Sequence, residues 1–325
     1  MQRRDLLKSG LAAAVGGWSG AARALAEQSD ETPNSAIPPK PIHDRICLFT
    51  DHVDDSGFSY RDVAKMFRQL GVAGPDLTVR GGGLVPPERV SEELPKAAAA
   101  FRDEGLSIPM LTTSITDAAD PVARATLKAM SEIGIGYYKL GYYHYHDLAG
   151  WESELKQTQQ AVAGLVEIGK PLGVVGGIHN HAGPTVGGVL WDLSRLLEPL
   201  DANWIGAYFD PAHATVEGGN YGWKLNFQVL ARQLKMIALK DFVWERTNGQ
   251  WRVRWCPLGE GMVRWPDFFA LLRGVRFAGP ISLHIEYDVG GNTRAERFDN
   301  SLAAAGRDLE FLKARLEEAY SAPDE

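Results

Sequence analysis

The feature that most constrains the fold of this chain is an alternation between short apolar runs and longer amphipathic patterns. The apolar runs have the length and continuous hydrophobicity of strands that are buried on both faces. Eight of them are found, at Ile46–Thr50, Asp76–Arg80, Ser107–Leu111, Tyr137–Gly141, Gly173–Ile178, Trp204–Phe209, Met236–Lys240 and Ile281–Glu286. Eight helical patterns follow them in turn, at Tyr60–Leu70, Pro87–Glu104, Pro121–Ile133, Trp151–Gly169, Val189–Leu196, Lys224–Leu234, Trp265–Val275 and Ser301–Tyr320.

This count distinguishes between two α/β architectures. Eight strand–helix units in roughly 280 residues match the size of a (β/α)8 barrel. A doubly wound open sheet more often has about five to seven strands and a glycine-rich nucleotide loop. The run Arg80-Gly81-Gly82-Gly83 lacks the spacing of such a loop. The sequence therefore predicts an α/β fold, a (β/α)8 TIM barrel, as a single domain over residues 43–325.

One segment after the seventh strand departs from the alternation. The stretches 243–246 and 251–255 alternate in polarity and flank Asn248-Gly249, a strong signal for a β-hairpin. The hairpin should rise from the carboxyl-terminal face of the barrel, where barrel active sites lie. Four tryptophans lie in or just after it, Trp244, Trp251, Trp255 and Trp265. A dimer contact or a small core of the hairpin explains them better than a carbohydrate platform.

The first residues have the signals of an export sequence rather than of a folded element. Residues 2–8 resemble the twin-arginine signal, with Arg3 and Arg4 followed by leucines and Lys8. A mild Gly/Ala-rich stretch leads to Ala24-Leu25-Ala26, which fits the small-x-small cleavage rule. We therefore expect a signal peptide over residues 1–26 and a flexible Pro-rich leader over residues 27–42. The protein should be periplasmic or otherwise exported through the twin-arginine pathway, with no membrane span in its mature chain.

Charge excludes one class of partner. The chain has a net charge of −7, and removal of residues 1–26, with four basic residues and one acidic residue, makes it −10. A nucleic-acid binder needs a basic face, so we expect no nucleic-acid partner. The two cysteines, Cys47 and Cys256, either pair in an oxidising compartment or remain buried free thiols.

Ionisable residues gather where the predicted strands end. Such groups in apolar strands are costly to bury unless they are paired, metal-bound or hydrated, so they predict a polar functional pocket at the barrel mouth. The candidates are Asp51, Arg80, Lys139, His179, His181, Asp210, His213, Lys240, Asp241, His284 and Glu286. Tyr142–His146 either lines a sugar subsite or packs within its loop.

Four ordered motifs carry a resemblance to a known family. They are Phe209-Asp210-Pro211-Ala212-His213, Leu239-Lys240-Asp241, Pro257-Leu258-Gly259-Glu260-Gly261 and Leu283-His284-Ile285-Glu286-Tyr287. Together they resemble the sugar phosphate isomerase/epimerase-like proteins, the xylose-isomerase-like TIM barrels. The resemblance implies a divalent-metal barrel that acts on sugars or polyols, including ketose epimerases, aldose–ketose isomerases and inosose dehydratases.

The resemblance also implies a ligand set, from which this chain departs. Relatives hold the metal with a Glu, an Asp, a His and a Glu on strands five to eight. Asp210 and Glu286 match, whereas His179 replaces the first Glu and Ala238 replaces the strand-seven His. A site of His179, Asp210 and Glu286 would favour Mn²⁺, Zn²⁺ or Fe²⁺ over Mg²⁺. A metal-free centre with Lys240 or Lys139 as the positive charge is an equal alternative.

The roles of the site residues follow from this comparison. We expect Glu286, His179 and Lys240 to be catalytic. Substrate binding is expected of His213, His181, Lys139, Arg80 and Asp51. His213 could instead be a structural residue at a helix start, and Lys240 could form a buried ion pair with Asp241.

The sequence is compatible with two functions. The first is an exported sugar isomerase or epimerase, possible as a homodimer, that abstracts a proton next to a carbonyl of a sugar or keto-sugar; lyase or dehydratase chemistry begins with the same step. The second is a non-catalytic carbohydrate-binding protein on a degraded isomerase barrel, for which the changes at His179 and Ala238 are the evidence. Endonuclease chemistry is disfavoured, because it needs more metal ligands and a basic face.

Overall fold

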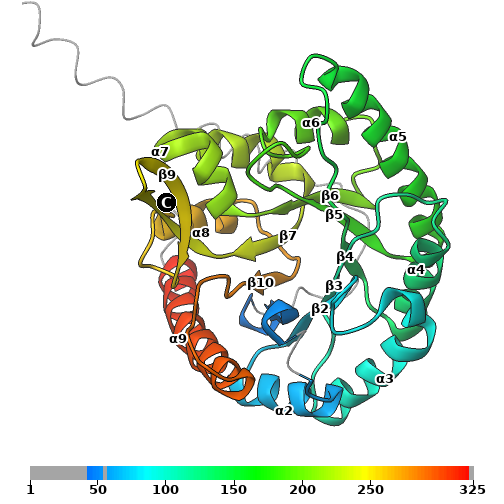
Figure 1. Cartoon of the computed structure of the whole chain (residues 1–325). Helices are drawn as coiled ribbons and strands as arrows, with labels where there is room; N and C mark the ends of the chain where they lie inside the picture. The colour runs from blue at the N-terminus through cyan, green and yellow to red at the C-terminus, as the bar shows by residue number, and fades with distance from the viewer. Residues whose placement is uncertain (1–41, 54–56, 322–325) are drawn as a thin grey trace, which may run out of the picture.

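The computed structural model describes residues 42–53 and 57–321. The predicted signal peptide and the leader up to residue 41 lie outside these residues. Within them, the chain forms one closed barrel of parallel strands with helices around the outside (Figure 1). No helix of this described part is long and apolar enough to cross a membrane.

Eight parallel strands form the barrel, in the order β1-β2-β3-β4-β5-β6-β7-β10. Their bounds are β1 Ile46–Phe49, β2 Gly74–Val79, β3 Met110–Thr113, β4 Tyr137–Lys139, β5 Val175–His179, β6 Ile205–Phe209, β7 Leu234–Leu239 and β10 Ile281–Leu283. The barrel closes where Ile46 of β1 pairs with Ile281 of β10. The predicted (β/α)8 barrel is thus confirmed, with strand bounds shifted by one to three residues.

The helices cover the outside of the barrel. Their bounds are α2 Tyr60–Leu70, α3 Val90–Asp103, α4 Pro121–Ile133, α5 Trp151–Gly169, α6 Trp191–Leu197, α7 Pro211–Leu230, α8 Trp265–Gly274 and α9 Arg294–Ser321. Short 3-10 helices add η1 Ile42–Arg45, η2 Thr50–Val53, η3 Pro87–Arg89, η4 Lys170–Leu172 and η5 Ala231–Gln233. Local signals set several ends: Ser59 and Asp62 form a capping box for α2, and Asp120 caps α4.

The helix α7 begins earlier than the pattern from Lys224 predicts. The Asp210 carboxylate accepts hydrogen bonds from the amides of Ala212 and His213, and Pro211 supplies the first helical residue. Gly219 interrupts the helix with a positive φ of 59°, so the amphipathic period restarts beyond it. This break hides the first half of α7 from a periodicity analysis.

The predicted hairpin is confirmed. The strands β8 Asp241–Thr247 and β9 Gln250–Cys256 pair antiparallel around Asn248 and Gly249, whose φ angles of 52° and 80° fit a type I′ turn. The two cysteines do not pair: both Cys47, inside the barrel, and Cys256, at the end of β9, are free.

Side chains pack the barrel in two regions. The larger core lies between the strands and the surrounding helices and includes Phe67, Phe101, Phe227 and Phe268. A small cluster fills the interior of the barrel, made of Cys47, Met110, Tyr208, Met236 and Ala238. Because this cluster fills the interior of the barrel, a substrate site is expected at its carboxyl-terminal mouth.

Candidate functional site

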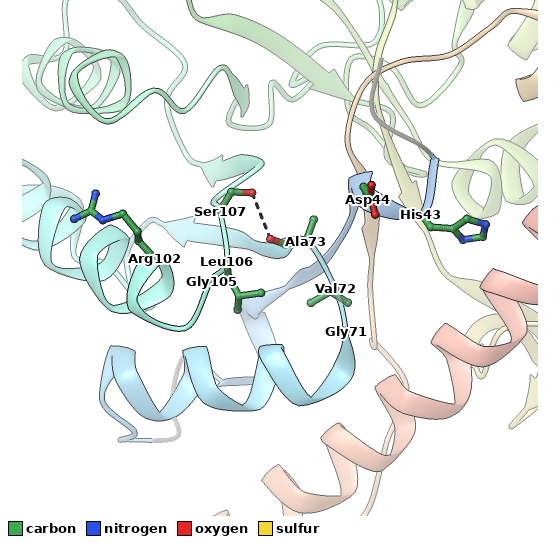
Figure 2. Close-up of a pocket in the computed structure, with 9 residues that line it drawn as sticks. All are labelled: His43, Asp44, Gly71, Val72, Ala73, Arg102, Gly105, Leu106 and Ser107. Atoms are coloured by element: carbon green, nitrogen blue, oxygen red, sulfur yellow. Dashed lines mark hydrogen bonds between the residues drawn. The ribbon is translucent and has the colours of Figure 1, made fainter. Parts of the chain in front are cut away.

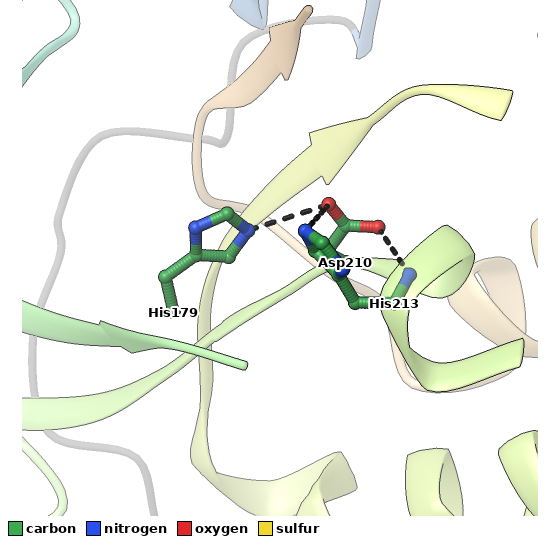
Figure 3. A group of neighbouring side chains, drawn as sticks. All are labelled: His179, Asp210 and His213. Carbon is green, nitrogen blue, oxygen red and sulfur yellow. Dashed lines mark hydrogen bonds and ion pairs between the residues drawn. The ribbon is translucent and has the colours of Figure 1, made fainter. Parts of the chain in front are cut away.

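Asp210 lies at the centre of the mouth and is fully buried. One of its carboxylate oxygens caps α7, and its backbone N–H and C=O bond the side-chain amide of Asn180 at 2.7 and 3.0 Å. The other oxygen, Oδ2, faces three side chains from neighbouring elements. Figure 3 shows two of them, His179 Nε2 at 3.3 Å and His213 Nε2 at 3.9 Å. The third is Lys240 Nζ at 3.5 Å. The helix cap thereby fixes the oxygen that enters the site.

Lys240 joins Asp210 to the second carboxylate of the site. Its ammonium donates to both oxygens of Glu286 at 2.9 Å, and it also lies 4.5 Å from the centre of the Trp255 ring. Burial opposes ionisation of Glu286, but the adjacent Lys240 charge and a hydrogen bond from His284 hold the pKa of this carboxyl well below its usual range. Glu286 is therefore an ionised carboxylate at neutral pH.

Two histidines of the cluster are held neutral. Burial, followed by the nearby Lys240 charge, lowers the pKa of His179 and of His213 well below the usual range. The Nδ1 atom of His179 lies 3.0 Å from the hydroxyl of Tyr142. The Nδ1 atom of His213 accepts the backbone N–H of Ala182 at 3.2 Å. A neutral His213 therefore carries its proton on Nε2, an atom with no hydrogen-bond partner among the described residues.

A further buried carboxylate, that of Asp76, lies beneath the mouth of the barrel. Asp76 of β2 accepts from Thr112 at 2.8 Å, from Ser282 at 2.8 Å and from Tyr208 at 3.1 Å. The Tyr208 hydroxyl also lies 2.9 Å from Nε2 of His284, whose Nδ1 is 3.1 Å from Glu286. Polar contacts thus run without a break from Asp76 to the site.

Asp76 and Tyr208 are not among the site residues predicted from the sequence, which also leaves open whether Tyr142 and Trp255 line the site or pack within their loop and hairpin. A signal existed for Asp76, because a charged residue inside an apolar strand must find partners. For Tyr208 the sequence gives no signal, and for Tyr142 and Trp255 it does not decide between the alternatives, because their function depends on which ring faces the centre.

The remaining predicted residues line the rim of the cluster. Lys139 is buried, with its ammonium 3.5 Å from the centre of the Tyr142 ring, and burial together with the Arg80 charge lowers its pKa to about 7. The ring of His181 lies 4.0 Å from that of His213. Arg80 forms an ion pair with Asp51.

Arg80 and Asp51 lie one layer away from the centre. The Arg80 guanidinium lies 5.5 Å from the centre of the Phe49 ring, which stacks on His284 at 4.3 Å. The structure thus brings His179, Asp210, His213, Lys240 and Glu286 into contact. It places His181, Lys139, Arg80 and Asp51 around them.

Lys240 and Asp241 do not form an ion pair with each other, because neighbouring residues of an extended chain point to opposite sides. Asp241 instead accepts the backbone amides of Gly259, Gly261 and Val263 and the indole N–H of Trp265. An added Cβ at Gly261 would collide with the Asp241 carboxylate. The Pro-Leu-Gly-Glu-Gly motif is therefore a loop that wraps this carboxylate.

Three donors are close enough together to hold a metal ion, His179, Asp210 and His213, with ligand atoms within 4.8 Å of one another. The chemistry of these donors fits a divalent cation poorly. His213 presents Nε2–H, a donor rather than a lone pair, and Lys240 already occupies the free oxygen of Asp210. Glu286, an expected ligand, lies outside the set and binds Lys240.

The opposite end of the barrel contains a hollow of about 480 Å³ (Figure 2). It lies before the first three strands, between residues 43–44, 71–73 and 105–107, with Arg102 at its edge. Barrel chemistry takes place at the carboxyl-terminal face, so this hollow is on the wrong side for catalysis. It contains none of the expected site residues.

Comparison with known proteins places the chain in a family. The family model described as xylose isomerase-like TIM barrel matches residues 64–315. No curated protein sequence matches the chain.

Three solved structures illustrate the likeness. D-allulose 3-epimerase from Methylomonas sp. superposes with a TM-score of 0.61 at 17% identity, over 85% of this chain and 99% of that one. 3-keto-D-glucoside 4-epimerase from E. coli superposes with a TM-score of 0.60 at 12% identity, over 83% of this chain and 99% of that one. A xylose isomerase-like TIM barrel protein from Mycobacterium smegmatis, in complex with magnesium, superposes with a TM-score of 0.60 at 14% identity, over 82% of this chain and 91% of that one. At these identities the structures establish the fold alone, while the family model covers most of the chain. The chain belongs to the xylose isomerase-like TIM barrel family.

Proposed function

We propose that this protein is an exported enzyme of the sugar isomerase or epimerase type, which abstracts a proton next to a carbonyl of a sugar or keto-sugar. The observation that carries the proposal is the buried chain Asp210–Lys240–Glu286, with neutral His179 beside it. The pKa values of Glu286 and His179 are both lowered, so each can accept a proton at neutral pH, and clustered groups with shifted pKa values are typical of functional sites. Structural neighbours named as a D-allulose 3-epimerase and a 3-keto-D-glucoside 4-epimerase support this substrate class.

Each group has a separate task in this reaction. Proton abstraction next to a carbonyl produces an enediolate, whose oxygen carries a negative charge. Glu286 stays ionised and accepts the proton, while the Lys240 ammonium stabilises the charged oxygen. A proton returns to the carbon from solvent through Nε2 of His179, and Glu286 releases the proton that it accepted to solvent. His213 donates its unpartnered Nε2–H to a substrate oxygen.

Metal assistance does not enter this mechanism. A divalent metal would supply positive charge at the same substrate oxygen. The donors nearest to Asp210 fit it poorly, for the reasons of protonation and charge given above, and Lys240 provides the charge instead.

Solvent exchange tests the proposal directly. The mature chain is incubated in D₂O with D-allulose, D-fructose and a 3-keto-glucoside, and NMR follows deuterium entry at the carbon next to the carbonyl. We expect exchange with at least one sugar and its loss in Glu286→Gln. The control Glu260→Gln changes an exposed carboxylate outside the cluster and should exchange at the wild-type rate. Absence of both exchange and sugar binding in the wild type would refute the proposal.

The same experiment addresses the carbohydrate-binding alternative. The exchanged ligand His179 and the lost one at Ala238 favour that function. A binding protein would bind a sugar in calorimetry without catalysing exchange, and Glu286→Gln would weaken its affinity only modestly.

Export is part of the proposal and rests on Arg3, Arg4 and the cleavage signal at Ala24–Ala26. A double Arg3→Lys, Arg4→Lys variant should remain in the cytoplasm with its leader attached. The unaltered chain should appear outside it, beginning at Glu27 by mass spectrometry. Processing of the double variant at the wild-type level would contradict the twin-arginine assignment.

A further inference from the structure

Lys240 has the surroundings of a bound cation. Its ammonium lies 2.9 Å from each oxygen of Glu286 and 3.5 Å from Oδ2 of Asp210, and its side chain is only 3% exposed. Two carboxylates from different strands therefore converge on one buried positive charge. The Trp255 ring, 4.5 Å away, adds a further face that favours a cation.

The strand that carries Lys240 explains how the charge reaches this place. Ala238 and Lys240 are two residues apart and so lie on the same side of the strand. Ala238 packs in the apolar cluster inside the barrel with Met236 and Tyr208. Position 238 therefore has no atom that could bind a metal. Lys240, two residues further toward the mouth, has a long cationic side chain instead.

The neighbouring imidazoles do not compensate for this change. His213 accepts an amide N–H at Nδ1, which leaves a proton on Nε2 and no lone pair toward Asp210. His179 is then the one imidazole of this group that could act as a ligand, and only if its Nε2 gives up the hydrogen bond to Oδ2 of Asp210 at 3.3 Å. With a single such imidazole, and with both carboxylates bound to an ammonium, a divalent cation would have to displace Lys240.

We propose that the ammonium of Lys240 is the resident cation of this centre and replaces the divalent metal ion. The part of this proposal that concerns the substrate oxygen rests on the proposed function. The part that concerns metal binding does not.

Metal titration tests the proposal without any turnover. The mature protein is dialysed against a chelator, and Mn²⁺ binding is followed by electron paramagnetic resonance and calorimetry. We expect no stoichiometric binding by the wild type at tens of micromolar Mn²⁺ and no change in its melting temperature. Binding of one Mn²⁺ per chain that is lost in Asp210→Asn would overturn the proposal.

A pair of lysine variants tests the mechanism of exclusion. In Lys240→Met the carboxylates of Asp210 and Glu286 lose their cation, so Mn²⁺ should bind and raise the melting temperature of the variant. The matched control is Lys139→Met, which removes a buried lysine that lies on a tyrosine ring and should gain no Mn²⁺ site. Equal Mn²⁺ binding by the two variants would contradict the proposed role of Lys240.

If Lys240→Met fails to fold, the Mn²⁺ titration of the wild type still tests the proposal, because it needs no variant. Lys240→Arg keeps the charge and should also exclude Mn²⁺, whereas stoichiometric binding by this variant would count against the proposal. Failure of the proposed function is a separate result. It would appear as absent deuterium exchange in a protein that still excludes Mn²⁺.

Discussion

Two buried lysines of the mouth should respond to the same substitution in opposite ways. Lys240 lies between two carboxylates, whereas Lys139 lies on the ring of Tyr142, and burial with the Arg80 charge lowers its pKa to about 7. In the unfolded chain the pKa of Lys139 returns to about 10.5. We predict that Lys139→Met stabilises the protein and that the gain is greatest below pH 7.

The magnitude follows from the two pKa values. At about 1.4 kcal/mol per pH unit, the difference between about 10.5 and about 7 corresponds to about 5 kcal/mol. Below pH 7 both states of the wild type carry the proton, so the full penalty of about 5 kcal/mol opposes folding. Between pH 7 and 10.5 the folded protein releases the proton first, and the penalty falls as the pH rises.

Urea denaturation at about pH 6 and about pH 9.5 measures this difference. The free energy of unfolding of Lys139→Met should exceed that of the wild type by about 5 kcal/mol at the lower pH and by about 1 kcal/mol at the higher pH. Lys240→Met should lose about 3 kcal/mol or more at neutral pH, because it leaves buried carboxylates unpaired. A pH-independent loss of stability in Lys139→Met would refute the reasoning, since it would mean that packing rather than charge sets the contribution of Lys139.

Two further predictions concern the supports of the site. Tyr208→Phe removes the hydroxyl between Asp76 and His284, so we expect a loss of about 1–3 kcal/mol in the free energy of unfolding by urea denaturation; an unchanged midpoint would show that the hydroxyl is not needed there. Gly261→Ala forces a Cβ against the Asp241 carboxylate and should destabilise the protein by more than about 1 kcal/mol. The control Gly222→Ala, in a helix with open space around the new Cβ, should be neutral or stabilising by up to about 1 kcal/mol, and equal effects of the two changes would contradict the steric argument.

The sequence was sufficient to predict the barrel because the signal was repeated. Eight apolar runs separated by helical patterns fit few other folds, and an error of a residue or two at one strand end leaves the count unchanged. The hairpin was predictable for a different reason, since Asn248-Gly249 specifies its own turn geometry. The early start of α7 was missed because its signal is a cap at Asp210 and a break at Gly219, not a period.

The sequence predicts which residues form the site but not which of them contact one another. Ionisable residues at strand ends had to meet at the mouth, which placed Lys240, Asp210 and Glu286 together. Their sequence does not say which carboxylate the lysine contacts, because that depends on the depth of each side chain in the barrel. Lys240 accordingly pairs across strands with Glu286 and not with its neighbour Asp241.

The depth of one side chain also decides how this centre differs from a metal site. A histidine at position 238 would have a shorter side chain than lysine and would lie inside the barrel beside Tyr208. Its buried ring nitrogens would then need a partner such as a metal ion. Alanine at that position leaves apolar packing, and the charge moves to Lys240, whose stem spans the distance to both carboxylates. An ammonium supplies hydrogen bonds in three directions but a single charge, so it can hold an enediolate oxygen only while Glu286 or Asp210 yields part of its contact. Activity in such a centre should therefore depend on the separation of Lys240 from its carboxylates more than on added metal.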